Sequence, residues 1–332
     1  MRHVARVLVT GGAGFIGHCT VRLLAERKHR VSVVDNLSSG NHALPEARLH
    51  VMDIASPELR HVFKEEKPDY VIMLASQVGV ASSIRDPLED ARVNVLGTTN
   101  LLWACVEFRV KKVVYASSAA VYGTSAGPVT TEDTDLRPTT FYGLSKLTAE
   151  KYVRMFGLHY GLPFTILRYS NVYGPGQERS KEPGVVSRFL QCALNGATPV
   201  VYGDGEQTRD FVYVEDVAQA NLAALTLGEN HAINISSGRA ISVRRLLSTI
   251  ARLTRTNLRP VFAPRTEGEI AHSTLDNSKA AMVLGWRPQT NLRSGLRKTL
   301  RHLLNTGDHA SVVGLREALE TPAAASLLPN RP

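Results

Sequence analysis

The sequence predicts an α/β protein: a doubly wound parallel sheet with a smaller, interleaved C-terminal lobe for substrate. Three observations favour this fold. A strand runs into a glycine-rich turn and a helix at the start of the chain, short apolar runs then alternate with helix-length segments, and longer Gly- and Pro-rich loops follow Asn171. The 332 residues, 43% of them hydrophobic, are enough for one large domain and a smaller lobe.

The glycine-rich turn lies within Val7–Gly17. Gly11, Gly14 and Gly17 give a G-x-x-G-x-x-G spacing, and Gly12 with the last two also satisfies G-x-G-x-x-G. Glycines at these positions allow a tight turn, close approach of the backbone to a pyrophosphate and close packing of helix on strand. The segment therefore indicates dinucleotide binding in a Rossmann-type fold.

An acidic residue, Asp35, follows the second expected strand, Arg30–Val34. It lies close to the interval of about 20 residues at which a carboxylate meets the adenosine ribose. A turn that merely linked strand to helix would leave this position unexplained. A carboxylate repels a 2′-phosphate, and Asn36–Gly40 contains no Arg to receive one, so the sequence favours NAD over NADP.

The remaining elements follow from the alternation of apolar runs. Strands are expected at Val31–Val34, Arg48–Val51, Tyr70–Leu74, Lys112–Ala116 and Phe164–Leu167. Two later runs, Phe211–Val214 and Ala232–Ile235, are predicted to return to the first sheet. We therefore expect an NAD-binding domain over 1–170 with returning segments at about 209–235, a substrate-binding lobe over 171–208 and 236–305, and a tail over 306–332.

Composition excludes several classes of partner. The net charge is +9, but the Lys and Arg residues are scattered, so we expect neither nucleic-acid nor membrane binding. Positive potential would help to attract a dianionic nucleotide diphosphate. Cys19, Cys105 and Cys192 have no zinc spacing, so no metal is expected, and they are typical of reduced thiols in a cytoplasmic protein. No apolar run has membrane-span length, and because Met1–Val4 leads directly into the first strand we expect no signal peptide.

The catalytic candidates are Tyr142 and Lys146, which share one face of an expected helix, and Ser118, which follows a strand at the sheet edge where such folds bind ligands. Y-x-x-x-K alone is common on helix surfaces, but here it is the third matching element in order. A tyrosine that acts as a base near neutral pH needs its pKa lowered by about 3 units, and an adjacent ammonium with an oxidised nicotinamide has the required charge.

These motifs do not stand alone. They occur with Asn94–Thr98, Leu167–Pro175, Arg209–Val214 and Leu284–Trp286. Over roughly residues 4–305 the sequence resembles the extended short-chain dehydrogenases/reductases, in the nucleotide-sugar epimerase branch typified by UDP-glucose 4-epimerase. The resemblance implies NAD as cofactor and 4-epimerisation of a nucleotide-diphosphate sugar through a transient 4-keto intermediate. It also implies a homodimer, with an interface around Val93–Cys105 and Ala149–His159.

The resemblance also implies roles for individual residues. Cofactor binding falls to Gly11, Gly14, Phe15, Ile16, Gly17, Asp35, Asn36, Asp53, Ile54, Leu74, Ala75, Ser76, Asn94, Tyr142, Lys146 and Tyr169. Asp53 and Ile54 would hold the adenine, and Asn94 would support the active-site strand and helix. Substrate binding falls to Ser118, Asn171, Tyr202, Arg209, Arg265 and Ser273. The two arginines would grip the diphosphate, for which a planar guanidinium is suited.

Departures from the family pattern bear on the substrate. The pair Ala119-Ala120 stands where 4,6-dehydratases carry an acid, so dehydration is not expected. The segment after Arg265 is one residue longer than usual. Ser273 aligns with a bulky Tyr of some relatives, which leaves room for an N-acetyl group, so UDP-GlcNAc joins UDP-glucose as an expected substrate. The alternatives are a UDP-uronic acid 4-epimerase, a keto-sugar reductase and a non-catalytic NAD-sensing protein.

Overall fold

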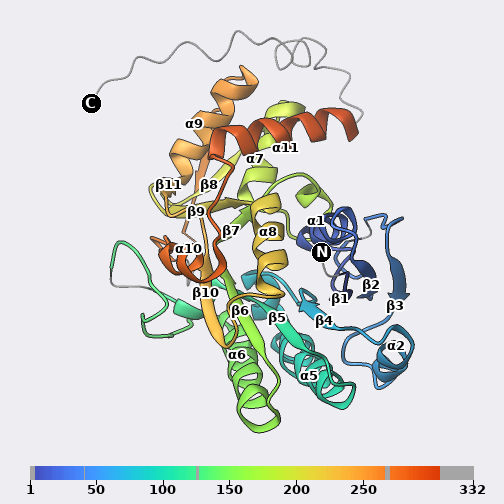
Figure 1. Ribbon diagram of the computed structural model, residues 1–332. Helices are drawn as coiled ribbons and strands as arrows, with labels where there is room; N and C mark the ends of the chain where they lie inside the picture. Colours follow the sequence, from blue (N-terminus) through green and yellow to red (C-terminus); the bar gives the residue numbers. More distant parts are fainter. Residues whose placement is uncertain (1–3, 41, 125–126, 266–269, 307–332) are drawn as a thin grey trace.

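The computed structural model describes residues 4–40, 42–124, 127–265 and 270–306. Its main body is a seven-stranded sheet in the order β10-β6-β5-β4-β1-β2-β3, with every neighbouring pair parallel (Figure 1). The strands are β1 (Arg6–Thr10), β2 (Arg30–Asp35), β3 (Arg48–Val51), β4 (Tyr70–Met73), β5 (Lys112–Ser118), β6 (Phe164–Tyr169) and β10 (His231–Ile235). The predicted doubly wound parallel sheet is confirmed.

Helices cover both faces of this sheet, because its strands are apolar on both sides. Alternate residues of β1 divide between two cores: Val7 and Val9 pack in one, Leu8 in the other. The first core contains residues of α1 (Phe15–Glu26) and α8 (Val214–Ala224), and the second contains residues of α2 (Leu59–Glu66), α5 (Thr98–Glu107) and α6 (Phe141–Tyr160). The shorter helical segments of this body are α3 (Val80–Arg85), α4 (Pro87–Ala91), η1 (Arg92–Gly97), η2 (Ala119–Tyr122) and α10 (Ser278–Leu284).

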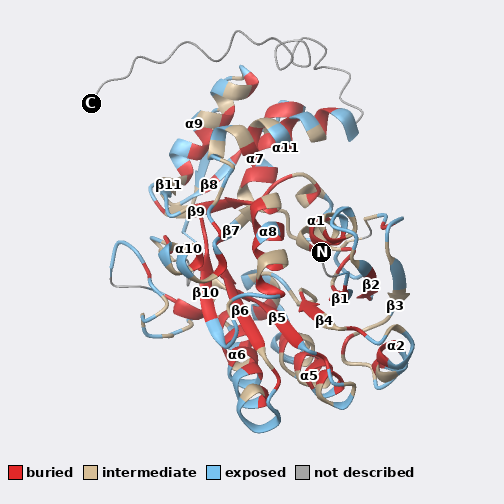
Figure 2. Ribbon diagram, in the orientation of Figure 1, coloured by how far each residue is buried: buried red, intermediate tan, exposed pale blue. Residues whose placement is uncertain are grey.

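A second lobe lies beyond the carboxyl end of the sheet. It contains a three-stranded sheet, β11-β9-β7, and a two-stranded sheet, β12-β8. Its elements are β7 (Asn171–Tyr173), η3 (Gln177–Arg179), α7 (Val185–Asn195), β8 (Val200–Tyr202), β9 (Thr208–Tyr213), β11 (Ala240–Ser242), α9 (Val243–Thr254), β12 (Val261–Ala263) and α11 (Leu292–Thr306). Residues of α7, α9 and α11 form their own apolar core here, and Figure 2 shows buried stretches in both parts of the molecule.

The two predicted returning strands have different outcomes. β10 joins the main sheet beside β6, as predicted. The prediction for Phe211–Val214 is wrong: β9 pairs with β7 and β11 in the separate sheet, and Val214 begins α8. An apolar run predicts a buried strand but not which sheet it joins, and the place beside β6 is taken by β10. The division near residue 170 remains our proposal.

The predicted tail, 306–332, lies outside the described residues except for Thr306, the last residue of α11. No helix in the part of the chain that the structure describes has the length and apolar character needed to cross a membrane.

Candidate active site

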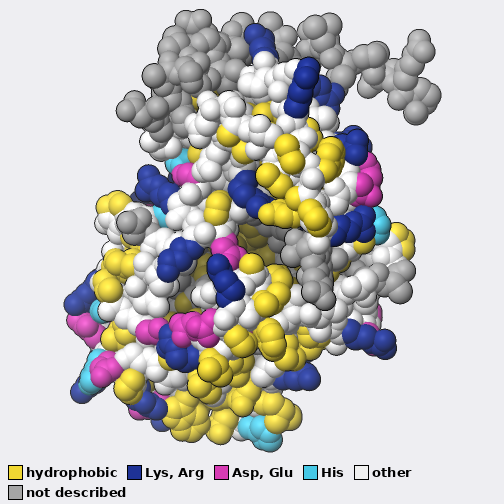
Figure 3. All heavy atoms as spheres, turned by 180° about the vertical axis from the view of Figure 1, so that it is seen from behind, with side chains coloured by type: hydrophobic (Ala, Val, Ile, Leu, Met, Phe, Trp, Pro, Cys, Tyr) yellow, Lys and Arg dark blue, Asp and Glu magenta, His cyan; other side chains and the backbone are white. Residues whose placement is uncertain are grey.

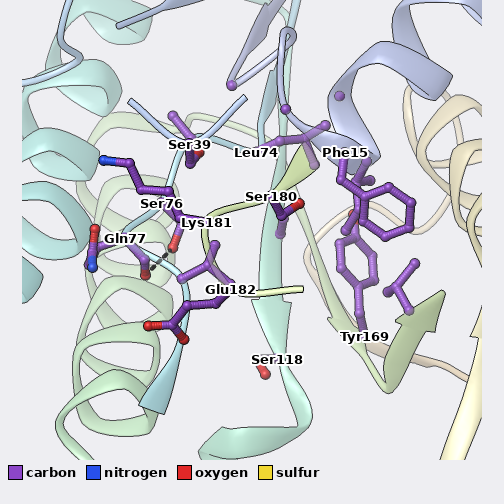
Figure 4. Close-up of a pocket in the computed structure, with 18 of the residues that line it drawn as sticks. Phe15, Ser39, Leu74, Ser76, Gln77, Ser118, Tyr169, Ser180, Lys181 and Glu182 are labelled. Atoms are coloured by element: carbon purple, nitrogen blue, oxygen red, sulfur yellow. Dashed lines mark hydrogen bonds between the residues drawn. The ribbon is translucent and has the colours of Figure 1, made fainter. Parts of the chain in front are cut away.

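A cavity of 540 Å³ lies where the carboxyl ends of the main strands meet the second lobe. Figure 4 shows Phe15 and Tyr169 on one side of the view, Ser76, Gln77, Lys181 and Glu182 on the other, and Ser118 at the end of β5. The predicted site residues that line the cavity are Gly11, Gly14, Phe15, Ile16, Gly17, Asp35, Asn36, Asp53, Ile54, Leu74, Ala75, Ser76, Ser118, Tyr142, Lys146, Tyr169 and Asn171.

Two glycines of the turn after β1 leave no room for a side chain. Gly11 has φ +70°, and a Cβ there would lie 2.6 Å from the Ala75 amide nitrogen. A Cβ on Gly17 would lie 2.0 Å from the Gly11 carbonyl oxygen, because α1 packs directly against the turn. A Cβ on Gly14 meets only that same oxygen, at 3.3 Å. The start of α1 therefore faces the cavity as bare backbone, which suits the pyrophosphate of a dinucleotide.

Asp35 is fixed at the end of β2 by the backbone around it. Its carboxylate accepts hydrogen bonds from the amides of Ala13, at 2.9 Å, and Leu37, at 2.8 Å. Burial raises the pKa of this carboxyl, and the two amide bonds oppose that shift. Each carboxylate oxygen retains capacity for another donor, as recognition of a ribose hydroxyl requires.

Asp53 has a partner that sequence reasoning missed. Arg92 donates to its carboxylate at 2.9 Å, and Asn36 donates at 3.2 Å. Burial alone raises the pKa of Asp53, but the Arg92 contact and the Ala55 amide outweigh it and hold the pKa below its usual value. The predicted cofactor residues Asn36 and Asp53 are thus directly linked.

The catalytic candidates converge from α6 and β5. Thr140 caps α6 by accepting a hydrogen bond from the Gly143 amide at 3.0 Å, which fixes the start of the helix carrying Tyr142. Burial raises the pKa of Tyr142 to about 12, a hydrogen bond with Ser118 lowers it, and the charge of Asp90 raises it. This direction is opposite to the one that a base needs, so the protein's own groups keep Tyr142 as a phenol.

Lys146 lies beneath the cavity, 3% exposed. Its ammonium donates to the Ser76 hydroxyl at 3.5 Å and stands 4.8 Å above the centre of the Tyr115 ring. Burial lowers the pKa of Lys146 to about 8, while Glu150 and Asp90 raise it. The side chain is therefore mostly charged at neutral pH.

Asn94 is buried and does not line the cavity. Its carboxamide oxygen accepts hydrogen bonds from the Ser76 hydroxyl, at 2.8 Å, and the Gln77 amide, at 2.9 Å. Its nitrogen donates to the Gln77 carbonyl and to the Ser145 hydroxyl, both at 3.1 Å. These contacts connect the segment after β4 to α6, and the supporting role of Asn94 stays a prediction.

The predicted substrate residues fall into separate groups. Asn171, on β7, lines the cavity and pairs with Phe211 of β9. Arg209 lies two residues before Phe211 on β9. The Ser273 amide donates to the Thr208 carbonyl at 3.2 Å, which places Ser273 beside β9 as well.

Tyr202 and Arg265 belong to a different part of the lobe. Tyr202 is the last residue of β8, and Arg265 follows β12, the strand that pairs with β8. Arg265 is bound to Asp204 at 3.2 Å. Tyr202, Arg209, Arg265 and Ser273 do not line the cavity, and the longer segment that follows Arg265 lies outside the described residues. The roles given to these four residues therefore stay predictions.

Sequence reasoning missed one wall of the cavity. Ser180, Lys181 and Glu182, in the loop before α7, line it, and Glu182 contacts the hydroxyl of Ser82 on α3. The available signal was the Gly- and Pro-rich loop directly after β7, at the ligand-binding edge. Two residues that line the cavity also carry a buried side-chain oxygen, Ser170 Oγ and Gln177 Oε1, with no hydrogen-bond partner within the described chain.

The geometry can be compared with known proteins. The family model described as the NAD dependent epimerase/dehydratase family matches residues 7–236. The chain belongs to this family. As a member of it the protein uses NAD, and the glycine turn and Asp35 are the kinds of groups that this cofactor needs. The expected resemblance and the expected NAD-dependent epimerase class of enzyme are confirmed.

Individual family members match over most of their length. The UDP-glucose 4-epimerase of Mycolicibacterium smegmatis is 38% identical, over 90% of this chain and 99% of its own. The Thermotoga maritima UDP-glucose 4-epimerase, solved with UDP-glucose, has a TM-score of 0.89 and 39% identity, over 90% and 99%. The Thermus thermophilus enzyme, solved with NAD, has a TM-score of 0.87 and 36% identity, over 91% and 100%.

Proposed function

We propose that this protein is a nucleotide-sugar 4-epimerase that interconverts UDP-glucose and UDP-galactose, with UDP-GlcNAc and UDP-GalNAc as further substrates. The observation that carries the proposal is the meeting of Ser118, Tyr142 and Lys146 in the same cavity as the glycine turn and Asp35. With NAD and a sugar bound in this space, an acid–base group would be within reach of the sugar carbon that exchanges hydride. The UDP-glucose bound by the Thermotoga maritima relative supports the choice of substrate.

The protein's residues have distinct tasks in this reaction. Tyr142 takes the proton from the sugar O4, Ser118 shares the proton path, and the Lys146 ammonium stabilises the phenolate that forms. Bound NAD supplies the hydride acceptor and donor. Because Tyr142 is a phenol in the protein alone, it must release its own proton to solvent before it can accept the O4 proton, and the positive charge of bound NAD would lower its pKa in the direction that this release requires. The 4-keto sugar then turns and is reduced from its other face.

Substrate binding is assigned to the second lobe. Arg209 and Arg265 would hold the diphosphate, Asn171 would donate to a phosphate, and Tyr202 would lie near the base. Support comes from the position of Arg209 on β9, beside the strand that carries Asn171 into the cavity. Ser273 would leave space beside the sugar C2 substituent.

The deciding experiment incubates the purified protein with UDP- and dTDP-sugars, including UDP-glucuronic acid, and separates the C4 epimers. We expect UDP-glucose and UDP-galactose to reach equilibrium without added cofactor. Denatured protein should release NAD, because a redox-neutral epimerisation returns the hydride in each turnover. Turnover that needs added NADPH would identify a keto-sugar reductase. Conversion of UDP-glucuronic acid alone would identify a uronic acid 4-epimerase. Release of NAD without any turnover would identify a non-catalytic NAD-sensing protein.

A homodimer belongs to the same proposal. Along α5 and α6, Trp103, Tyr152, Met155 and Leu158 are between 41% and 75% exposed. Figure 3 shows hydrophobic side chains at the lower end of the molecule, where these helices lie in Figure 1. A second copy packed on this face would bury them.

Light scattering should give twice the chain mass for the wild type and the chain mass for Trp103→Glu; a monomeric wild type would contradict the dimer.

We also propose a cytoplasmic setting, which the free thiols of Cys19, Cys105 and Cys192 favour.

A further inference from the structure

A buried carboxylate lies behind the catalytic lysine and has no task in the mechanism above. Asp90, on α4, is 1% exposed. Its carboxylate accepts a hydrogen bond from the Asn94 nitrogen at 3.1 Å and another from the Ser145 hydroxyl. A buried carboxylate carries a large desolvation cost unless its charge is used, so its position calls for an explanation.

Hydrogen bonds connect Lys146 to Asp90 in one direction. The Lys146 ammonium donates to the Ser76 hydroxyl at 3.5 Å, and that hydroxyl donates to the Asn94 carbonyl at 2.8 Å. The Asn94 nitrogen then donates to Asp90. The Ser76 hydroxyl also has the Gln77 carbonyl as an acceptor, at 3.0 Å, and the Asn94 nitrogen also contacts Gln77 and Ser145, so the connection from the ammonium to the carboxylate is one branch of a shared network.

The helix is irregular where this connection is made. Between α4 and α5 the chain forms the π-helical turn η1, which carries Asn94. Such turns insert one extra residue and are frequent at functional sites. This one lets the Asn94 side chain reach Asp90, Ser76 and Ser145 together.

Glu150 provides the contrast. It lies on α6 one turn after Lys146, and it is as deeply buried as Asp90. Arg168 binds both of its oxygens, at 2.9 and 2.7 Å, so its charge is already matched. No salt bridge of the described residues includes Asp90, whose hydrogen-bond partners are neutral. Both carboxylates raise the pKa of Lys146, Glu150 more than Asp90, but only Asp90 acts without a cationic hydrogen-bond partner of its own.

We propose that Asp90 is a positioning residue that, through Asn94 and Ser76, holds the Lys146 side chain charged and directed at the active site. The inference rests on the catalytic role proposed for Lys146. Asp90 touches neither substrate nor cofactor in this proposal.

The titratable groups around Lys146 fix the sign of the effect. They are Tyr142 and Glu150 on α6, Tyr115 on β5 and Asp90 on α4. Asp90 raises the pKa of Lys146 and also that of Tyr142. Its neutralisation should lower both, so both limbs of the pH–activity profile should move to lower pH. A purely structural role would lower activity without moving either limb.

The test is Asp90→Asn in the full-length protein. Lys146 is titrated by NMR of ¹³C-labelled lysine, with its signal assigned from Lys146→Arg, and the pH dependence of kcat/KM is measured in parallel. We expect the Lys146 midpoint, about 8 in the wild type, to fall by about one pH unit. The matched control is Asp86→Asn, which removes the same charge from the cap of α4, where asparagine caps equally well. It should leave the midpoint unchanged.

Asp90→Ser, which is neutral and smaller, is the second variant, and Asp90→Glu should restore the midpoint. An unchanged Lys146 midpoint in either folded neutral variant would overturn the proposal, and so would a failure of both to fold, since the role would then be structural. The NMR titration needs no turnover. It therefore distinguishes failure of this inference from failure of the epimerase assignment, which the sugar panel tests.

Discussion

The residues expected to bind the pyrophosphate and ribose of the cofactor, the cofactor half of the site, lie close together in the chain, whereas the residues expected to bind the substrate, the substrate half, come from distant segments. Gly11–Gly17 and Asp35 all belong to the first β-α-β unit. Asn171, Arg209 and Ser273 lie on neighbouring segments only because β7 and the segment after β12 both pair with β9. Where site residues are close in the chain, the backbone between them fixes their positions. Where they come from distant segments, their positions depend on how the second lobe packs.

The two halves also differ in how tightly their residues are held. Gly17 has no space for even one methyl group, and Asp35 is held by two backbone amides. Arg265 is 58% exposed, and its partner is the equally exposed Asp204. We therefore expect substitutions to have larger effects in the cofactor half, and the following experiments test that order.

The largest effect is expected for Gly17→Ala. The new methyl group would overlap the Gly11 carbonyl, so turn and helix must separate. NAD should be absent from the purified variant and its Tm lowered by several degrees, measured by chromatography of the denatured supernatant and by calorimetry. Gly14→Ala is the matched control, because its backbone is extended and its one close contact is at 3.3 Å, so its Tm should stay near that of the wild type. Full NAD content in Gly17→Ala would contradict the comparison.

Tyr142→Phe removes the proton-transfer group and leaves the glycine turn untouched. Turnover of UDP-glucose should fall at least about a hundredfold, while the NAD content stays unchanged. Steady-state assay of C4 epimers and NAD release measure the two quantities on one preparation. Near-normal turnover would show that another residue is the base.

The two arginines of the substrate half should differ from each other. Arg209→Ala should raise KM for UDP-glucose about tenfold to a hundredfold, since charged hydrogen bonds to the diphosphate are lost. Arg265→Ala should raise it less than about fivefold, because an exposed side chain already paired with Asp204 contributes little. Equal effects of the two substitutions would contradict this contrast between the arginines.

The smallest effect on overall activity is expected for Ser273→Tyr. The larger side chain should suppress conversion of UDP-GlcNAc by steric exclusion and leave UDP-glucose nearly unaffected. Ser273→Ala serves as the control and should keep both activities. A wild-type enzyme that is inert towards UDP-GlcNAc would remove the basis of this prediction.

The sequence by itself determined the cofactor half. The glycine spacing, Asp35, and Tyr142 with Lys146 are short-range patterns, and backbone sterics and the helical repeat carry them directly into geometry. The parallel order of β1 to β6 followed from the same alternation of strands and helices. The assignment of both Ser76 and Lys146 to the cofactor site came from the family resemblance, whereas the contact between them is seen only in the structure.

The tertiary structure alone decided where β9 pairs, which charges meet, and what the catalytic groups experience. An apolar strand pattern reports burial but not its neighbour, so β9 was assigned to the wrong sheet. Arg92 beside Asp53, Glu182 beside Ser82 and Asp90 behind Lys146 join segments whose spacing carries no signal. The direction of the Tyr142 pKa also depends on burial, a property of the packed molecule, because desolvation depends on everything that surrounds the hydroxyl and not on the residues next to it in the chain.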